Sequence, residues 1–214
     1  MIRHALFAAL APVLLAGRDA GKARQTAENL GCEARHIDLA APEKWDEALA
    51  GVGTVVVCVD QQDAGFPAHV LTRGLTYVDV TASDGFFRQV EEFDSLARQK
   101  GGRAILSVGL APGLTNLLAR ACAETMDRAE SAQIGVMLGL GDEHGAAAID
   151  WTLAGFRSAR KMHAEIETVA FGTPPRDHPA MVFDFADQHV VRRTLGLEDA
   201  RTLLTFDSAM LSRL

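Results

Sequence analysis

Short apolar runs alternate with longer segments of helical spacing along the chain as far as Met126. The apolar runs predict β-strands, and they lie at residues 13–16, 34–39, 54–59, 77–80 and 104–108. Parallel strands that are buried on both faces have continuous apolar runs of this kind. Strands that alternate with helices at this spacing predict an α/β fold with a doubly wound parallel sheet.

The segments between these runs have the spacing of amphipathic helices. The first follows Asp19, a suitable N-cap, and the second opens at Pro42. A third is predicted at residues 67–72, and a fourth begins after Ser83 or Asp84. The apolar positions expected to face inward are Ala23, Ala27, Leu30, Trp45, Ala48, Leu49, Phe86, Val90, Phe93 and Ala97.

Residues 104–126 combine a buried strand, a glycine-rich turn and a helix. Gly109, Pro112 and Gly113 form the predicted turn, and Pro112 suits the first turn of a helix because its missing N–H would have no partner there. From Leu114 the apolar residues recur at helical spacing, which predicts a stripe packed against a sheet. The helix N-terminus then faces the carboxyl edge of the strand, where open α/β sheets hold their ligands. A purely structural strand-turn-helix unit also explains this stretch.

The pattern changes after Asp127, as expected where a second domain begins. We predict one domain at residues 1–130 and a second, of α+β type, at residues 131–214. The elements expected in the second are a strand at 131–138, a polar glycine loop at 139–145, a helix that carries Ile149 and Phe156, an exposed antiparallel strand at 162–171, a strand at 181–185, a helix at 190–195 and a strand at 202–206.

Composition and charge limit the classes of partner. The chain has 214 residues, of which 48% are hydrophobic, enough for a sizeable core. Its 21 basic and 28 acidic residues give a formal net charge of -7, which argues against nucleic acid or an anionic membrane as the main partner. No run approaches the roughly 20 apolar residues of a membrane span. Pro12 interrupts the N-terminal apolar run, so we do not predict a secretory signal.

The cysteines also carry information about the compartment. Cys32, Cys58 and Cys122 are odd in number, far apart, and placed in apolar or helical contexts. This pattern predicts reduced core thiols in a cytoplasmic protein, and neither a disulfide framework nor a metal site.

Several segments carry a family resemblance: VLLAGRDAGKA (residues 13–23), VVVCVDQQD (55–63), YVDVTAS (77–83) and SVGLAPGLTNLLA (107–119). They resemble the saccharopine dehydrogenase family, specifically its reductase-type members, and the last segment is the most specific. GDEHG and the helix through Trp151 are similar to the start of that family's second domain. The resemblance implies a Rossmann-like sheet and an NAD(P)-dependent oxidoreductase. Some members reversibly join an amino acid to an aldehyde through an imine.

The N-terminal segment departs from the family pattern. A member begins with a strand and a G-x-G-x-x-G turn, whereas residues 1–10 are similar to the tail of the helix that follows that turn. The missing first strand is the central one in the usual Rossmann order, so the doubly wound sheet is expected to be incomplete. The cofactor pyrophosphate would also lose the glycine turn that normally binds it.

The resemblance places a cofactor site along the strand ends. The second Rossmann strand normally ends in an acidic residue that binds the ribose of NAD, but this chain has Gly17 and Arg18 there. Arg18 and Lys22 suit the 2′-phosphate of NADP, so we expect NADP rather than NAD, although a solvated helix start explains the two cations equally well. Asp38 and Leu39 are expected to border the adenine. The other cofactor candidates are Val59, Thr81, Gly109 and Pro112.

Few catalytic residues are expected, because in nicotinamide-dependent reactions the protein mainly binds and orients the cofactor and the substrate. Thr115 and Asn116 are placed to hydrogen-bond a substrate, and helix capping explains them as well. His144 is the candidate for proton transfer. Asp142, Glu143 and His144 are adjacent and lack the spacing of metal ligands, so no metal is expected.

Other charged residues do not single out a site. An amino-acid substrate needs a guanidinium for its carboxylate, and the sequence does not choose among Arg157, Arg160, Arg192 and Arg193. The other histidines show no pairing in the sequence and are interpreted as surface or loop residues: His4, His36, His69, His163, His178 and His189.

Two hypotheses of different classes follow. The first is a saccharopine dehydrogenase-like oxidoreductase that transfers a hydride between NADP(H) and a small imine- or amino-acid-type substrate. The second is a catalytically inactive Rossmann remnant that acts as a binding or interaction module. The Arg18 and Pro112 regions favour the first, whereas the absent glycine turn favours the second and predicts weak or absent turnover. The resemblance also implies a homodimer formed through the sheet of the second domain.

Overall fold

The computed structural model describes residues 12–139 and 166–207. The chain divides into two compact units, one of Met1–Val78 with Glu92–Ala104 and the other of Asp79–Glu91 with Ile105–Leu214. Predicted features that lie outside the described residues are the N-terminal segment 1–10, most of the glycine loop with Asp142, Glu143 and His144, the helix through Trp151, and the residues His4, Arg157, Arg160 and His163.

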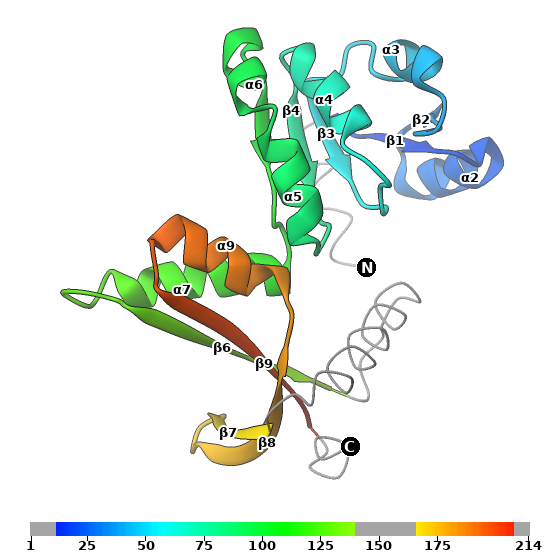
Figure 1. The fold of residues 1–214 in the computed structure, drawn as a ribbon. Coiled ribbons are helices and arrows are strands. Elements are labelled where there is room, and N and C mark those ends of the chain that lie inside the picture. Colours follow the sequence, from blue (N-terminus) through cyan, green and yellow to red (C-terminus); the bar gives the residue numbers. More distant parts are fainter. Residues whose placement is uncertain (1–11, 140–165, 208–214) are drawn as a thin grey trace. The chain divides into compact units, whose positions relative to one another are not determined.

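The first unit contains a sheet in two separate pieces (Figure 1). Strand β1 (Leu14–Gly17) pairs in parallel with β2 (Glu33–His36). Strands β3 (Thr54–Val57), β4 (Thr76–Asp79) and β5 (Arg103–Ile105) form the other piece in that order. Among the described residues no strand joins β1 to β3. The prediction of an incomplete Rossmann-like sheet is therefore confirmed.

The helices of the first unit follow the predicted caps and apolar faces. Helix α2 (Ala20–Leu30) begins after Asp19, whose carboxylate accepts the Lys22 N–H at 3.0 Å. A short 3-10 turn (Pro42–Lys44) leads into α3 (Trp45–Ala48), followed by α4 (Gly65–Thr72) and α6 (Asp94–Lys100). Trp45, Ala48 and Leu49 are buried as predicted, and the Trp45 ring packs edge-on against Phe66 of α4 with 5.1 Å between ring centroids.

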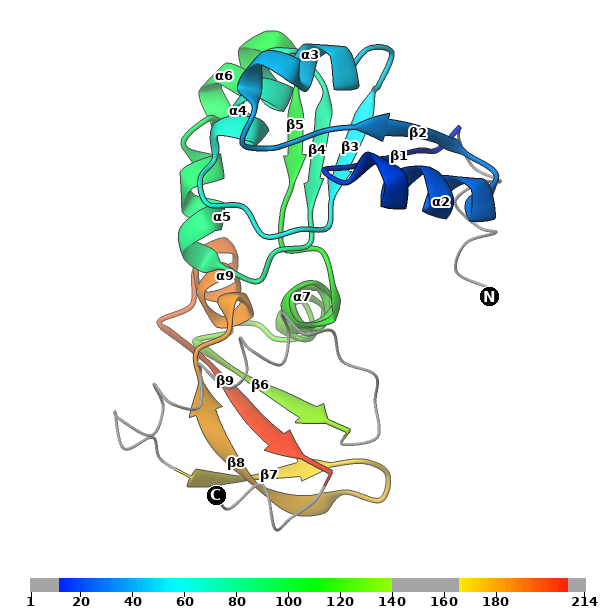
Figure 2. The same ribbon diagram turned by 90° about the vertical axis from the view of Figure 1, so that its right-hand side faces the viewer.

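In the described part of the second unit, two helices lie on one face of a four-stranded sheet. The sheet order is β6 (Ser131–Leu138), β9 (Asp199–Phe206), β8 (Arg176–Phe183) and β7 (Ile166–Phe171). Only β6 and β9 are parallel. Figures 1 and 2 show α7 (Thr115–Ala123) and α9 (Ala186–Leu195) on one face of this sheet. Helix α5 (Asp84–Glu91) belongs to the same unit.

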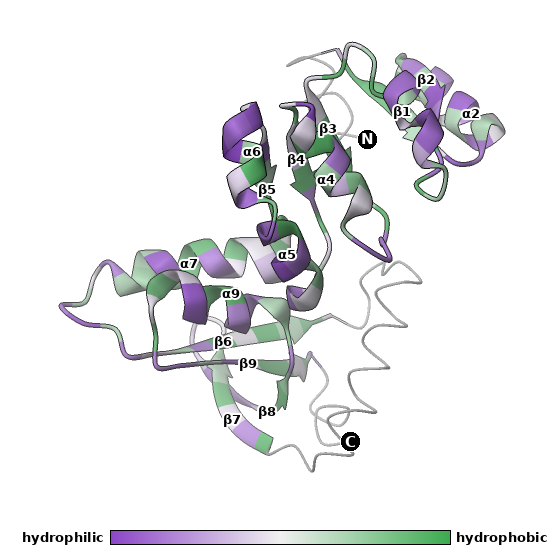
Figure 3. Cartoon of the chain, turned by 45° about the horizontal axis from the view of Figure 1, so that its top comes forward, coloured by the Kyte–Doolittle hydropathy of each residue, from purple (hydrophilic) through white to green (hydrophobic). Residues whose placement is uncertain are grey.

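The core of the second unit lies between α9 and the sheet. Hydrophilic and hydrophobic residues alternate along α9 (Figure 3), and its Val191 is fully buried. The buried cluster consists of Ile134, Val136, Phe183, Phe185, Val191, Leu197 and Leu204. The sheet also curls: a Cβ added to Gly135 of β6 would lie 2.9 Å from the Phe171 ring of β7, although β9 and β8 separate these two strands in the sheet.

The stretch at residues 104–126 differs from its prediction. Strand β5 is short and its three residues are exposed, so it is not a strand buried on both faces. Pro112 has extended backbone (φ -79°, ψ 159°) and precedes the helix, which starts only at Thr115. The predicted apolar stripe is also exposed, with 67% of Leu117 and 56% of Leu118 accessible. The physical reason is that α9, and not α7, covers the centre of the sheet in this unit.

Two further expectations are corrected. The single helix predicted to carry Phe86, Val90, Phe93 and Ala97 is broken into α5 and α6, although three of those residues are buried. The cysteines are free but are not core thiols, because Cys58 and Cys122 are exposed and Cys32 is half-buried. Among the described residues, no helix has the length and apolar character needed to cross a membrane.

Candidate functional site

The end of β1 presents cations and no available carboxylate. Gly17 closes the strand and its carbonyl accepts the Ile37 N–H at 3.1 Å. Arg18 is exposed directly after it and has no ion-pair partner among the described residues. Lys22 is exposed in the first turn of α2. The neighbouring acid, Asp19, caps α2, and the hydrogen bond from the Lys22 N–H is the main cause of the lowered pKa of its carboxyl.

The ends of β2 and β3 contribute the other predicted residues of the first unit. Asp38 forms a fixed turn, since its carboxylate accepts the Ala40 N–H and its carbonyl accepts the Trp45 indole N–H, both at 3.0 Å. Leu39 is half-buried beside it. Val59 follows β3 and is 59% exposed.

In the second unit, hydrogen bonds join the end of β4 to the turn before α7. The buried Asp79 accepts the Thr81 N–H at 2.5 Å through its carboxylate and the Val108 N–H at 3.2 Å through its carbonyl. Ser107 has a left-handed backbone (φ 62°), and its hydroxyl accepts a hydrogen bond of 2.7 Å from the Asn116 amide.

Two side-chain atoms at the start of α7 are left without partners. Thr115 Oγ1 and Asn116 Oδ1 are buried and have no hydrogen bond in the part of the chain that the structure describes. Native proteins pair nearly all such atoms, so these two oxygens are available to a ligand or an ordered water. This turn and the start of α7 thus carry the predicted residues Gly109, Pro112, Thr115 and Asn116, and Asp79 links the segment of Thr81 to the turn.

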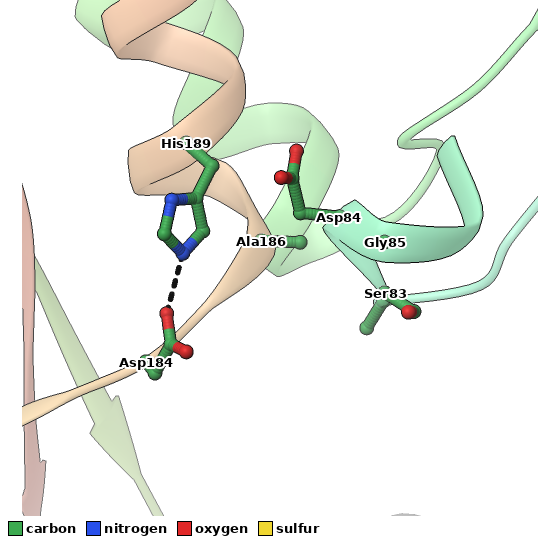
Figure 4. A pocket seen from close by; sticks show the side chains of 7 residues that line it. Ser83, Asp84, Gly85, Asp184, Ala186 and His189 are labelled. Atoms are coloured by element: carbon green, nitrogen blue, oxygen red, sulfur yellow. Dashed lines mark hydrogen bonds and ion pairs between the residues drawn. The ribbon is translucent and has the colours of Figure 1, made fainter. Parts of the chain in front are cut away.

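A pocket of about 460 Å³ opens between the start of α5 and the start of α9 (Figure 4). It lies within the second unit, directly after Thr81, and is lined by Ala82, Ser83, Asp84, Gly85, Asp184, Ala186 and His189. His189 Nε2 lies 2.5 Å from Asp184 Oδ1, and the Gln188 side-chain amide donates to the same oxygen at 2.8 Å. Neither Asp184 nor His189 was predicted from the sequence as a site residue.

The second carboxylate of the pocket, Asp84, has a different environment. Its oxygens accept from Arg88 at 2.8 Å and from Arg193 at 2.5 Å, and Arg193 also contacts Glu91 at 2.9 Å. Burial by itself would raise the pKa of Asp84, but the two guanidinium hydrogen bonds outweigh it and hold the pKa below the ordinary value of 3.8. Arg193, one of the predicted substrate arginines, is thus engaged by two carboxylates of its own chain.

Comparison with known proteins identifies the fold. No family model matches the sequence, and no curated protein matches it. The solved structure of apo saccharopine dehydrogenase (L-Glu forming) from Saccharomyces cerevisiae matches 94% of this chain with a TM-score of 0.66 at 14% sequence identity. The chain has the saccharopine dehydrogenase fold. It covers 51% of the yeast enzyme, so it spans about half of that protein's length.

A second solved structure matches less well. GenD2 from gentamicin A biosynthesis, in complex with NAD, matches 89% of this chain and 57% of its own, with 17% identity and a TM-score of 0.44. The expected resemblance to saccharopine dehydrogenase is confirmed for the fold by the yeast structure. The assignment of the individual site residues stays a prediction.

Within this saccharopine dehydrogenase fold, two histidines are paired, contrary to the prediction. His69 Nε2 lies 2.7 Å from Asp46, which also binds Arg73, and His189 binds Asp184. His69 and Asp46 are 23 residues apart, so no local pattern indicates their contact. His189 and Asp184 flank the start of one helix five positions apart, a spacing that does not by itself indicate a contact.

The Asp84 cluster predicts a pH dependence. The pKa of Asp84 is lower in the folded state than in the unfolded chain, so its ionised carboxylate stabilises the fold. This stabilisation is fully present above pH 3.8 and is lost as the pH falls through the folded pKa. Asp84→Asn should weaken the second unit by about 1–3 kcal/mol at neutral pH and flatten its loss of stability in acid. Thermal melting monitored by circular dichroism from about pH 6 to about pH 2 measures both effects. Asp177→Asn, at an exposed carboxylate of β8, is the control, and equal acid sensitivity of the two variants would contradict the assignment.

Proposed function

We propose that this chain is an NADP-dependent oxidoreductase that transfers a hydride between NADP(H) and a small imine- or amino-acid-type substrate. The fold supports the dehydrogenase class, because the yeast protein of the same fold is a saccharopine dehydrogenase. The observation that carries the choice of NADP is the end of β1. Arg18 and Lys22 are exposed there, whereas the adjacent Asp19 is occupied as a helix cap.

We propose four groups of described residues as ligands of such a cofactor. Arg18 and Lys22 would bind the 2′-phosphate, and Asp38 with Leu39 would border the adenine. Val59 and Thr81 follow strands whose carboxyl ends hold ligands in open α/β sheets. The unpartnered oxygens of Thr115 and Asn116 fit a hydrogen-bonding ligand.

The cofactor, when bound, supplies or accepts the hydride, and the protein supplies orientation and a proton. Asn116 is held by Ser107, so its amide is fixed before any ligand arrives. Gly109 and Pro112 shape the turn that presents Thr115 and Asn116. We further propose that the protein acts in the cytoplasm as a homodimer formed through the sheet of its second unit.

The competing idea of an inactive Rossmann module is tested by nucleotides that carry only part of the cofactor. We expect 2′,5′-ADP to raise the melting temperature of the chain and to bind more tightly than 5′-ADP, because only the former carries the 2′-phosphate. A ligand at about 100 times its Kd stabilises the folded state by about 2.7 kcal/mol. Equal protection by the two nucleotides would contradict the role of Arg18 and Lys22, and protection by neither would favour the inactive module.

A further inference from the structure

The two carboxylates that line the pocket have different chemical roles available to them. Both oxygens of Asp84 are occupied by guanidinium groups, and its side chain is only 15% exposed. The Asp184 side chain is 74% exposed, has no arginine or lysine partner among the described residues, and has only its Oδ1 engaged. Asp84 is therefore fully engaged by its own chain, whereas the second oxygen of Asp184 is available to a ligand.

Asp184 is held in place by partners that are themselves anchored. The Gln188 amide that donates to Asp184 accepts the Thr202 N–H at 2.7 Å through its own oxygen. Thr202 belongs to the buried strand β9 and also binds the buried Asp187 at 2.7 Å. The carboxylate is therefore tied through α9 to the sheet, which is the preorganisation that a reactive group requires.

The geometry of the pair leaves one side open to a ligand. Figure 4 shows Asp184 with one oxygen directed to His189 and the other turned toward the side of the pocket where Ser83 lies. The lining also includes the small residues Gly85 and Ala186, whose side chains take up little of the pocket. The His189 side chain is 40% exposed, so a proton on the pair has a route to water.

We propose that Asp184 and His189 are the proton-transfer pair of this pocket, an inference that rests on the oxidoreductase function proposed above. The substrate is a secondary amine or alcohol with hydrogen on the carbon that carries the nitrogen or oxygen. On oxidation, that carbon loses a hydride to NADP+, and its N–H or O–H loses a proton to Asp184. The products are the C=N or C=O compound, NADPH, and one proton on the pair, which His189 releases to water. In this proposal Asp184 touches the substrate, whereas His189 acts through Asp184: it orients the carboxylate and passes the proton to water.

Steady-state kinetics of the full chain test this assignment. The probes are saccharopine and a panel of short secondary amines and alcohols, each with NADP+. We expect Asp184→Asn to lower kcat about 100-fold or more while the KM for NADP+ and the melting temperature stay unchanged. Asp177→Asn is the matched control, because it removes an exposed carboxylate of the same unit outside the pocket. His189→Gly should lower kcat about tenfold or more, and added imidazole should restore it in part, which a purely structural role would not allow.

Several outcomes would overturn the proposal. One is a kcat of Asp184→Asn equal to that of Asp177→Asn, and another is a His189→Gly variant that imidazole does not rescue. A wild-type chain that binds NADPH but oxidises none of the probes would also overturn it, while the cofactor proposal would stand. Failure of the wild-type chain to bind NADPH would instead contradict the proposed function itself.

Discussion

Replacing Arg18 with alanine is expected to raise the Kd for NADPH about 10- to 100-fold. A hydrogen bond to a charged group contributes about 1.5–3 kcal/mol, and each 1.4 kcal/mol is tenfold in affinity. Arg18 is exposed at the end of β1 and has no partner in the described part of the chain, so its guanidinium is available to the 2′-phosphate. Fluorescence titration with NADPH measures the change.

The same variant should leave NADH binding nearly unchanged, since NADH lacks the 2′-phosphate. Arg24→Ala is the matched control, because it removes an exposed guanidinium from the adjacent helix α2 and leaves Arg18 in place at the end of β1. An equal loss of NADPH affinity in Arg24→Ala would indicate a general effect of net charge. An unchanged Kd in Arg18→Ala would contradict the role of Arg18 as the selector of NADP.

Replacing Phe183 with alanine is expected to lower the free energy of unfolding of the second unit by about 3–5 kcal/mol. The Phe183 side chain is 2% exposed in the central cluster and packs on Phe185 with 4.9 Å between ring centroids. Its removal leaves a cavity between α9 and the sheet that neighbouring side chains fill only in part. Urea unfolding followed by circular dichroism measures the loss.

Ile166→Ala provides the comparison on the same sheet. Ile166 of β7 is 57% exposed, so its truncation should cost less than about 1 kcal/mol. Similar losses for the two variants would mean that the core of the second unit does not lie between α9 and the sheet.

Local patterns predicted the faces of several elements correctly. The positions of Ala23 and Ala27 on α2 and of Trp45 and Ala48 on α3 follow from helical spacing, because a helix buries one stripe. Asp19 caps α2 because a short acidic side chain at that position accepts a backbone N–H of the first turn. The Rossmann-like sheet was also expected to be incomplete, and it forms two pieces.

Predictions from local patterns were wrong where packing between distant elements decides the structure. Leu117 and Leu118 have helical spacing, but spacing does not say which of two helices covers a sheet, and in this unit α9 has the central place. The break between α5 and α6 has no glycine or proline to mark it. Sequence patterns report propensity along the chain and not the competition between elements that are distant in sequence.

The candidate site was predictable only where a fold-specific position defined it. Arg18 and Asn116 could be proposed from the sequence because their positions follow from strand ends and a recognisable turn, and their roles stay predictions. The Asp184–His189 pair was missed because His189 was interpreted without its neighbours. Only the pocket indicates Asp184 as a candidate. Asp84 lines the same pocket, but both of its oxygens accept hydrogen bonds from arginines.

The most direct test of this account is a titration of the purified 214-residue chain with NADPH and, separately, with NADH, followed by nucleotide fluorescence and melting temperature. The account predicts saturable binding of NADPH with a rise in melting temperature, and NADH binding that is at least about tenfold weaker. A well-folded chain that binds neither nucleotide would contradict the proposal that this saccharopine dehydrogenase fold works with NADP.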